Sequence, residues 1–140
     1  MKTTESGPAA PAFVWPVRVY YEDTDAAGVV YYANYLKFME RARTEWLRAL
    51  GFEQTALKQE HNVVFVVRAL AVEYLRPALF NDELKVSVSL TAARGGLLEI
   101  AQKISRGPLD LVTASVKIAC VNTQSFKPVR IPPSVLKKLA

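Results

Sequence analysis

Three acidic residues lie within four positions near the start of the chain. Glu22, Asp23 and Asp25 precede two alanines and Gly28, and an apolar, aromatic run then leads into a predicted helix near Tyr32. A carboxylate activates water, or attacks directly, when a carbonyl group is held beside it. The carbonyl oxygen needs N–H donors directed at it as negative charge develops. Because the start of a helix carries unpaired N–H groups, this segment contains both parts of a hydrolytic site.

The same segment also has an ordinary structural explanation. The sequence Asp-Thr-Asp ahead of a helix is common in turns and in helix caps, where the carboxylates accept bonds from backbone N–H groups. The residue types alone therefore leave two interpretations open, a catalytic carboxylate and a turn.

The helix that would present the N–H donors is predicted from periodicity. Between Tyr32 and Leu50, apolar residues recur at steps of three and four, which places them on one face of a helix. Gly51 suits the position that follows a helix. The apolar face consists of Tyr35, Phe38, Met39, Ala42, Trp46 and Leu50.

Five further segments are predicted as strands, because they alternate in polarity or are rich in β-branched residues. The segments are 15–22, 63–75, 84–92, 97–105 and 111–121. Tight turns join most of them, which makes neighbouring strands antiparallel. The sequence therefore predicts an α+β fold, an antiparallel five-stranded sheet wrapped round one long central helix. The exposed edges of such a sheet predict dimerisation.

Length and composition set further bounds. The 140 residues fit a single domain at 15–140, with residues 1–14 predicted as a disordered tail. No apolar run reaches the roughly 18 residues of a membrane helix. The N-terminus has no signal-peptide pattern and Cys120 is the single cysteine, which favours the cytoplasm. The net charge of +5 allows an anionic partner, but the basic residues are scattered without a nucleic-acid motif, so no nucleic-acid partner is expected.

A family resemblance narrows these possibilities. The run 18–52 closely resembles the signature of the 4-hydroxybenzoyl-CoA thioesterase family of hotdog-fold enzymes. The flanking WPVRVYYEDTD and the later FVVRALAVEYLRPA look most like the Tol–Pal system-associated acyl-CoA thioesterases, and the similarity extends from Trp15 to about Arg130. The resemblance implies the hotdog fold and hydrolysis of an acyl-CoA thioester to a carboxylic acid and free CoA.

The resemblance also implies roles for individual residues. Asp25 matches the catalytic aspartate, the second one of the D-x-D-x-x-G motif, and acts in the family as nucleophile or as general base. Tyr32 matches the residue at the helix start whose N–H polarises the carbonyl group. Gly28 matches the motif glycine, Asp23 matches a structural acid that fixes the loop through backbone hydrogen bonds, and Asn34 belongs to the same supporting loop.

Position 32 departs from part of the family. Many Tol–Pal-type members have histidine where this chain has Tyr32, whereas the 4-hydroxybenzoyl-CoA enzymes have tyrosine. The resemblance therefore does not by itself carry an acid or base role over to the Tyr32 side chain. The backbone N–H role is retained, because every residue except proline has that donor.

The CoA phosphates require basic residues, and five candidates are named. They are Arg68, Arg94, Arg106, Lys127 and Arg130. No cofactor is expected beyond the CoA of the substrate, and no metal, because His61 is the only histidine and has no partner for a metal pair. Cys120 is expected to pack in the core.

Two rival functions and several partners are considered. A hotdog dehydratase generally uses a histidine near the central helix, and none lies between Trp15 and Gly51. A non-catalytic module would bind acyl carrier protein, or proteins of the Tol–Pal system and of phospholipid synthesis, at the periphery of the inner membrane. The family suggests a homotetramer, a dimer of dimers, whose site lies between subunits.

Overall fold

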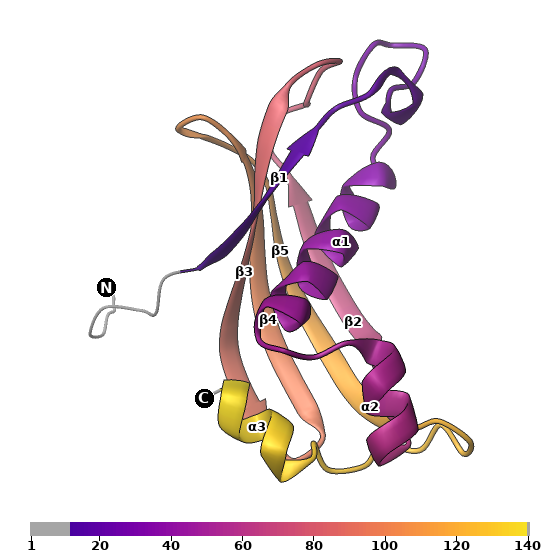
Figure 1. Ribbon diagram of the computed structural model, residues 1–140. Coiled ribbons are helices and arrows are strands. Elements are labelled where there is room, and N and C mark those ends of the chain that lie inside the picture. The colour runs from indigo at the N-terminus through magenta and orange to yellow at the C-terminus, as the bar shows by residue number, and fades with distance from the viewer. Residues whose placement is uncertain (1–11, 140) are drawn as a thin grey trace.

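The computed structural model of the protein describes residues 12–139, which form one sheet and the helices around it (Figure 1). The strands are β1 (Phe13–Arg18), β2 (Val63–Tyr74), β3 (Glu83–Arg94), β4 (Leu97–Arg106) and β5 (Leu109–Asn122). Their order across the five-stranded sheet is β1-β3-β4-β5-β2, and all neighbouring strands are antiparallel. The predicted α+β class and the five-stranded antiparallel sheet are confirmed.

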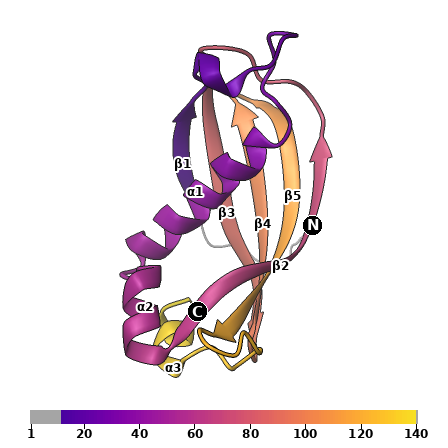
Figure 2. The same ribbon diagram turned by 90° about the vertical axis from the view of Figure 1, so that its right-hand side faces the viewer.

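The long helix α1 (Asn34–Ala49) crosses the concave face of this sheet, as two perpendicular views show (Figures 1 and 2). The short 3-10 helix η1 (Tyr21–Asp23) lies at the end of the sheet where α1 begins. Helices α2 (Gln54–His61) and α3 (Pro133–Leu139) lie at the opposite end. The acidic segment and the start of the central helix therefore share one end of the molecule.

The apolar face predicted for the central helix is the face that packs on the sheet. Five of its members, and Leu47 in addition, are buried. The buried residues are Tyr35, Phe38, Met39, Ala42, Trp46 and Leu47. Leu50 is half-buried just beyond the helix end. Phe38 is only 1% exposed, and full burial of such a side chain stabilises the fold by about 1.5–3 kcal/mol.

Some predicted boundaries of the first strand are wrong. The strand begins at Phe13, so residues 13 and 14 of the predicted tail belong to β1, while residues 1–11 lie outside the described part of the chain. It ends at Arg18 instead of Glu22. The carboxylate of Asp23 accepts a hydrogen bond from the Tyr20 N–H at 2.8 Å, and this bond turns the chain into η1.

Helix α1 begins two residues later than predicted. Tyr32 and Ala33 form a turn, Ala33 occupies the N-cap position, and Asn34 is the first helical residue. No side chain caps this end of the helix. The first N–H groups of the helix are therefore free of the capping bond that Ser, Thr or Asp would provide.

A buried polar link joins α1 to the sheet. Gln102 of β4 is 3% exposed, and its side-chain amide donates to the Met39 carbonyl oxygen at 3.1 Å. Its side-chain oxygen accepts a bond from the Arg43 guanidinium at 2.9 Å. Burial lowers the pKa of Arg43, and the nearby Glu40 carboxylate opposes that shift. The amide thus satisfies a charged group that would otherwise be costly to bury.

Candidate functional site

The acidic segment forms a tight turn whose two sides are bonded to each other. Thr24 and Val30 form an antiparallel bridge. The Asp25 N–H donates to the Val29 carbonyl oxygen at 2.9 Å, and the Gly28 N–H donates to the Asp25 carbonyl oxygen at 3.0 Å. Gly28 has φ of +81°, a conformation that other residues rarely adopt. A Cβ at Gly28 would meet no atom within 4 Å, so the backbone conformation, not space, favours glycine there.

Asp25 lies exposed at the first position of this turn. One oxygen of its carboxylate, Oδ1, accepts a bond from the Ala27 N–H at 2.8 Å. Among residues 12–139, no donor is bonded to the other oxygen. One side of the carboxylate is therefore oriented by the turn, and the other remains available to water or to a substrate atom.

Asp23 has a different environment from Asp25. Its carboxylate is bonded to the Tyr20 N–H. Its carbonyl oxygen accepts bonds from the Tyr31 N–H at 3.0 Å and from the side-chain amide of Asn34 at 2.9 Å. Because Asn34 is the first residue of α1, Asp23 ties the acidic turn to the start of the helix.

The start of α1 presents an unbonded backbone donor. The Asn34 N–H donates to the Tyr31 carbonyl oxygen at 2.8 Å, and the Leu36 N–H donates to the Ala33 carbonyl oxygen at 3.2 Å. The Tyr32 N–H has no acceptor in the part of the chain that the structure describes. This donor stands at the positive end of the helix dipole, which favours negative charge on an incoming oxygen.

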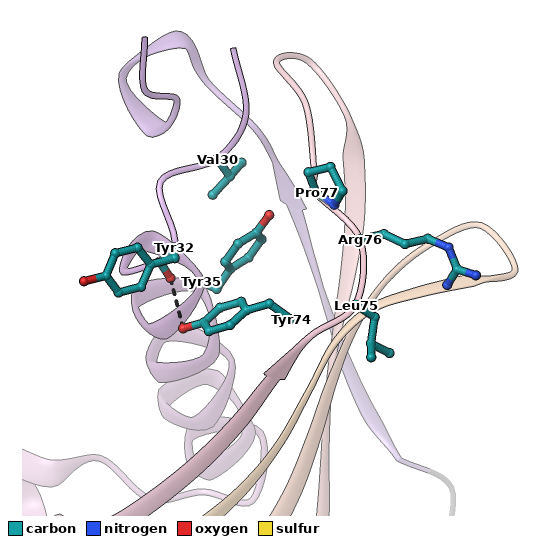
Figure 3. Close-up of a pocket in the computed structure, with 7 residues that line it drawn as sticks. All are labelled: Val30, Tyr32, Tyr35, Tyr74, Leu75, Arg76 and Pro77. Atoms are coloured by element: carbon teal, nitrogen blue, oxygen red, sulfur yellow. Dashed lines mark hydrogen bonds between the residues drawn. The ribbon is translucent and has the colours of Figure 1, made fainter. Parts of the chain in front are cut away.

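A pocket of about 270 Å³ lies beside this helix start (Figure 3). Its lining consists of Val30, Tyr32, Tyr35, Tyr74, Leu75, Arg76 and Pro77. The walls come from the end of the acidic turn, from the first turn of α1 and from the end of β2 with the residues after it. The pocket is mostly apolar and aromatic, a surface suited to an acyl group.

Two tyrosine hydroxyls hold the walls of the pocket together. The Tyr35 hydroxyl is buried and accepts a bond from the Ala78 N–H at 2.9 Å. The Tyr74 hydroxyl donates to the Tyr32 carbonyl oxygen at 3.4 Å, a long bond. Burial raises the pKa of Tyr35, against the lowering effect of its bond to Ala78. Burial also raises the pKa of Tyr74, with a further contribution from Tyr32.

The loop between β2 and β3 supports the acidic turn from the other side. The Val30 N–H donates to the Ala78 carbonyl oxygen at 2.9 Å. Arg106 fixes the same loop, since its guanidinium lies 2.7 Å from the Asp82 carboxylate and 3.4 Å from the Pro77 carbonyl oxygen. The ion pair with Asp82 is only partly exposed. Arg106, predicted to bind CoA phosphate, is therefore committed to holding the loop.

The other predicted basic residues do not gather at the acidic turn. Arg94 ends β3, at the end of the sheet far from η1, and pairs with Glu99 at 3.0 Å. Arg130 lies at the same far end, next to Ile131, whose N–H donates to the Gly95 carbonyl oxygen. The segment after β5, which includes Lys127, is bonded there as well. Arg68 is exposed at an irregularity in the middle of β2.

Of the seven residues that line the pocket, only Tyr32 is predicted from the sequence as a site residue, and the two tyrosines that hold its walls, Tyr35 and Tyr74, are not. The helical spacing predicts Tyr35 only as a member of the apolar face, and the strand pattern predicts Tyr74 only near the end of a strand. The sequence carried one usable signal for Tyr74, an aromatic residue shortly before Arg76-Pro77, where the strand must stop. Nothing in the sequence indicates that the Tyr35 hydroxyl reaches Ala78, 43 residues away.

The remaining candidates have no part in this site. Cys120 is buried, as predicted, and burial raises the pKa of its thiol. His61 is exposed at the end of α2. Across residues 12–139, no three His, Cys, Asp or Glu side chains are grouped to bind a metal ion. No helix in that range is long and apolar enough to cross a membrane.

Comparisons with known proteins identify the family. Residues 19–139 match the model of the thioesterase-like superfamily. The acyl-CoA thioesterase YbgC of Haemophilus influenzae is 48% identical over 123 residues, which cover 88% of this chain and 90% of that protein. The Helicobacter pylori enzyme of the same name is 34% identical over 82% of this chain and 90% of its own length. A probable thioesterase from Bartonella henselae superposes with a TM-score of 0.83 at 38% identity, covering 87% of this chain and 100% of that one. The family resemblance is thus confirmed, and the chain belongs to the thioesterase-like superfamily as an enzyme of the hotdog fold.

Proposed function

We propose that the protein hydrolyses acyl-CoA thioesters, with Asp25 and the Tyr32 N–H as its catalytic groups. The observation that carries the proposal is that hydrogen bonds join the acidic turn, which carries Asp25, to the start of the helix, which carries the Tyr32 N–H. Asp25 has a free carboxylate oxygen, the Tyr32 N–H has no acceptor within residues 12–139, and Asp23 ties the two segments together. The names of the YbgC relatives agree with this activity.

In the proposed reaction, the thioester carbonyl oxygen accepts a bond from the Tyr32 N–H and the acyl group occupies the aromatic pocket. Asp25 removes a proton from water as the water oxygen bonds to the carbonyl carbon. The carbon–sulfur bond then breaks and the proton held by Asp25 passes to the leaving sulfur, which gives a carboxylic acid and the CoA thiol. Direct attack by Asp25 would instead form an anhydride that water cleaves to the same products. Tyr32 takes part through its backbone N–H. This donor stabilises the transition state most, because negative charge develops there on the thioester carbonyl oxygen.

We propose in addition that the site is shared between two copies of the chain. Strand β2 is an edge strand with no partner on its outer side in the described structure. Its exposed apolar residues include Val66, which is 39% exposed. Pairing of two β2 edges would cover this edge and place Arg68 of a second copy near the acidic turn. Basic groups for CoA come from that copy, and two such dimers form the tetramer.

The test of the activity is release of free thiol across a panel of acyl-CoAs. The panel contains acetyl, butyryl, octanoyl, palmitoyl and benzoyl thioesters. Thiol release from at least one member by the wild-type protein, and its loss in Asp25→Asn, would support the proposal. An absence of release from every member would refute it.

A binding role is the second candidate, because aromatic side chains are exposed beside the acidic turn. Tyr21 is 81% exposed and Phe80 is 55% exposed, and their rings contact each other with centroids 5.8 Å apart. The net charge of +5 suits an acidic partner such as acyl carrier protein. Binding that persists in Asp25→Asn but is lost in Tyr21→Ala would identify this role.

The proposed cellular setting follows the family resemblance. We place the enzyme in the cytoplasm, at the periphery of the inner membrane, in connection with the Tol–Pal system or phospholipid metabolism. The dehydratase alternative lacks its histidine, since His61 is the only one in the sequence and lies exposed on α2. Co-purification of the tagged protein with Tol–Pal or phospholipid-synthesis proteins would test the setting.

A further inference from the structure

Strand β2 carries apolar side chains on the concave face of the sheet. Its residues face the same way as their cross-strand partners in β5. The four pairs are Val67 with Ile118, Leu70 with Val116, Val72 with Ala114, and Tyr74 with Val112. All four β5 partners are buried in the core that packs against α1. An irregularity in the register between Val67 and Ala69 keeps Val67 and Leu70 on one face although they are three residues apart.

These concave-face residues of β2, called the β2 strip below, remain accessible. Val67 is 48% exposed, Leu70 is 40% exposed and Tyr74 is 46% exposed. On the same concave face, helix α1 packs mainly against β1 and β3, near the edge of the sheet opposite to β2 (Figure 2). The helix therefore leaves the strip uncovered. The strip is thus an apolar track that runs along β2 and ends at the aromatic pocket.

Tyr74 is the last residue of the strip and also lines the pocket. Its ring contacts Tyr35 and Tyr32, with ring centroids 5.7 Å and 6.2 Å apart. Its hydroxyl donates to the Tyr32 carbonyl oxygen across the pocket (Figure 3). The ring therefore closes the β2 side of a pocket of about 270 Å³, which is below the roughly 300–1,000 Å³ of sites for drug-sized ligands. A small acyl group fits there, and a long chain does not.

We propose that Tyr74 determines the acyl-chain length that the enzyme accepts. With Tyr74 in place, short acyl groups fill the pocket, and the tail of a long chain is kept off the β2 strip. Without its ring, the pocket opens onto Leu70 and Val67, which then bury the tail. Pairing of β2 edges would join backbones and leave this face of each strand free. The inference rests on the proposed acyl-CoA hydrolysis and adds the residue that selects the substrate.

The experiment compares kcat/KM for butyryl-CoA and dodecanoyl-CoA in four proteins. They are the wild type, Tyr74→Ala, Tyr74→Phe and the control Phe126→Ala, which removes an exposed ring outside the pocket. Each buried methylene contributes about fourfold in affinity. A few methylenes on the strip should therefore raise the dodecanoyl-to-butyryl ratio of Tyr74→Ala at least tenfold, through a lower KM for the long substrate. Tyr74→Phe and Phe126→Ala should keep the wild-type ratio.

A second substitution locates the chain on the strip. Leu70→Asp placed in the Tyr74→Ala protein should return the ratio to the wild-type value. If Tyr74→Ala does not fold by circular dichroism, Tyr74→Leu takes its place. A wild type that prefers dodecanoyl-CoA, or an unchanged ratio in the folded variant, would overturn the role of Tyr74. Failure of the wild type to release thiol from any acyl-CoA would instead refute the proposed function.

Discussion

Removal of the Tyr35 hydroxyl tests how the pocket wall is held to the helix start. Tyr35→Phe deletes the acceptor of the Ala78 N–H, and Ala78 is 0% exposed. A buried donor left without a partner costs about 1–3 kcal/mol, so the free energy of unfolding should fall by about that amount. Tyr74→Phe is the matched control. Its hydroxyl makes a 3.4 Å bond at an exposed site, and we expect a loss below about 0.5 kcal/mol.

Urea denaturation measures both losses, and pH adds a second readout. The pKa of Tyr35 is raised in the folded protein above its ordinary value of 10.0, mainly by burial. The stability linked to a raised pKa is fully present below the unfolded-state value and is lost as pH rises through the folded-state value. The difference in stability between wild type and Tyr35→Phe should therefore shrink above about pH 10. Equal losses in the two Phe variants, or a difference that does not change with pH, would refute this reasoning.

The remaining predictions concern the catalytic groups and the shared site. Asp25→Asn should fold normally and lose at least about 100-fold in kcat, because it keeps the shape and removes the base or nucleophile; activity within threefold of wild type would exclude Asp25. Asp23→Asn should lower the melting temperature more than kcat, and the reverse result would exchange the roles of the two acids. Tyr32→Phe should retain activity within about tenfold, whereas Tyr32→Pro deletes the donor and should abolish it; a large loss in the Phe variant would bring the phenol into the reaction. Mixed oligomers of Asp25→Asn with an inactive, folded Arg68→Glu should regain part of the wild-type rate, and proven mixed oligomers without activity would argue against a shared site.

The sequence predicted the regular elements well because their signals are local. The stripe on α1 and the alternation in the strands reflect which side of each element is buried, and burial is what the structure shows at those positions. The end of β1 was predicted wrongly for the opposite reason. Tyr20 and Glu22 continue the alternation, but the Asp23 carboxylate accepts the Tyr20 N–H and turns the chain earlier.

The arrangement of the site depended on contacts that no local pattern encodes. Nothing in the sequence separates Arg106 from Arg94 as candidates. Arg106 is the last residue of β4, whereas Arg94 is the last residue of β3, so the two lie at opposite ends of the sheet. Arg106 pairs with Asp82, and Arg94 pairs with Glu99. The pairing of Arg106 with Asp82 follows from sheet topology, which fixes which strand ends meet. The acidic turn could be located from its motif, because its function depends on a continuous stretch of chain.

The link from Gln102 to α1 has a consequence for the distant end of the helix. The side-chain amide of Gln102 donates to the Met39 carbonyl oxygen, and Met39 lies five residues after Asn34, where the helix begins. At a rise of about 1.5 Å per residue, this bond lies roughly 7.5 Å along the helix axis from Asn34, and the Tyr32 N–H lies just before that residue. An apolar face of Leu, Phe and Met tolerates small sliding, whereas two directional bonds do not. The Gln102 carboxamide therefore fixes the position of the helix along its own axis, and with it the distance between the helix start and the acidic turn. Thioester hydrolysis would then depend on a core amide that never meets the substrate.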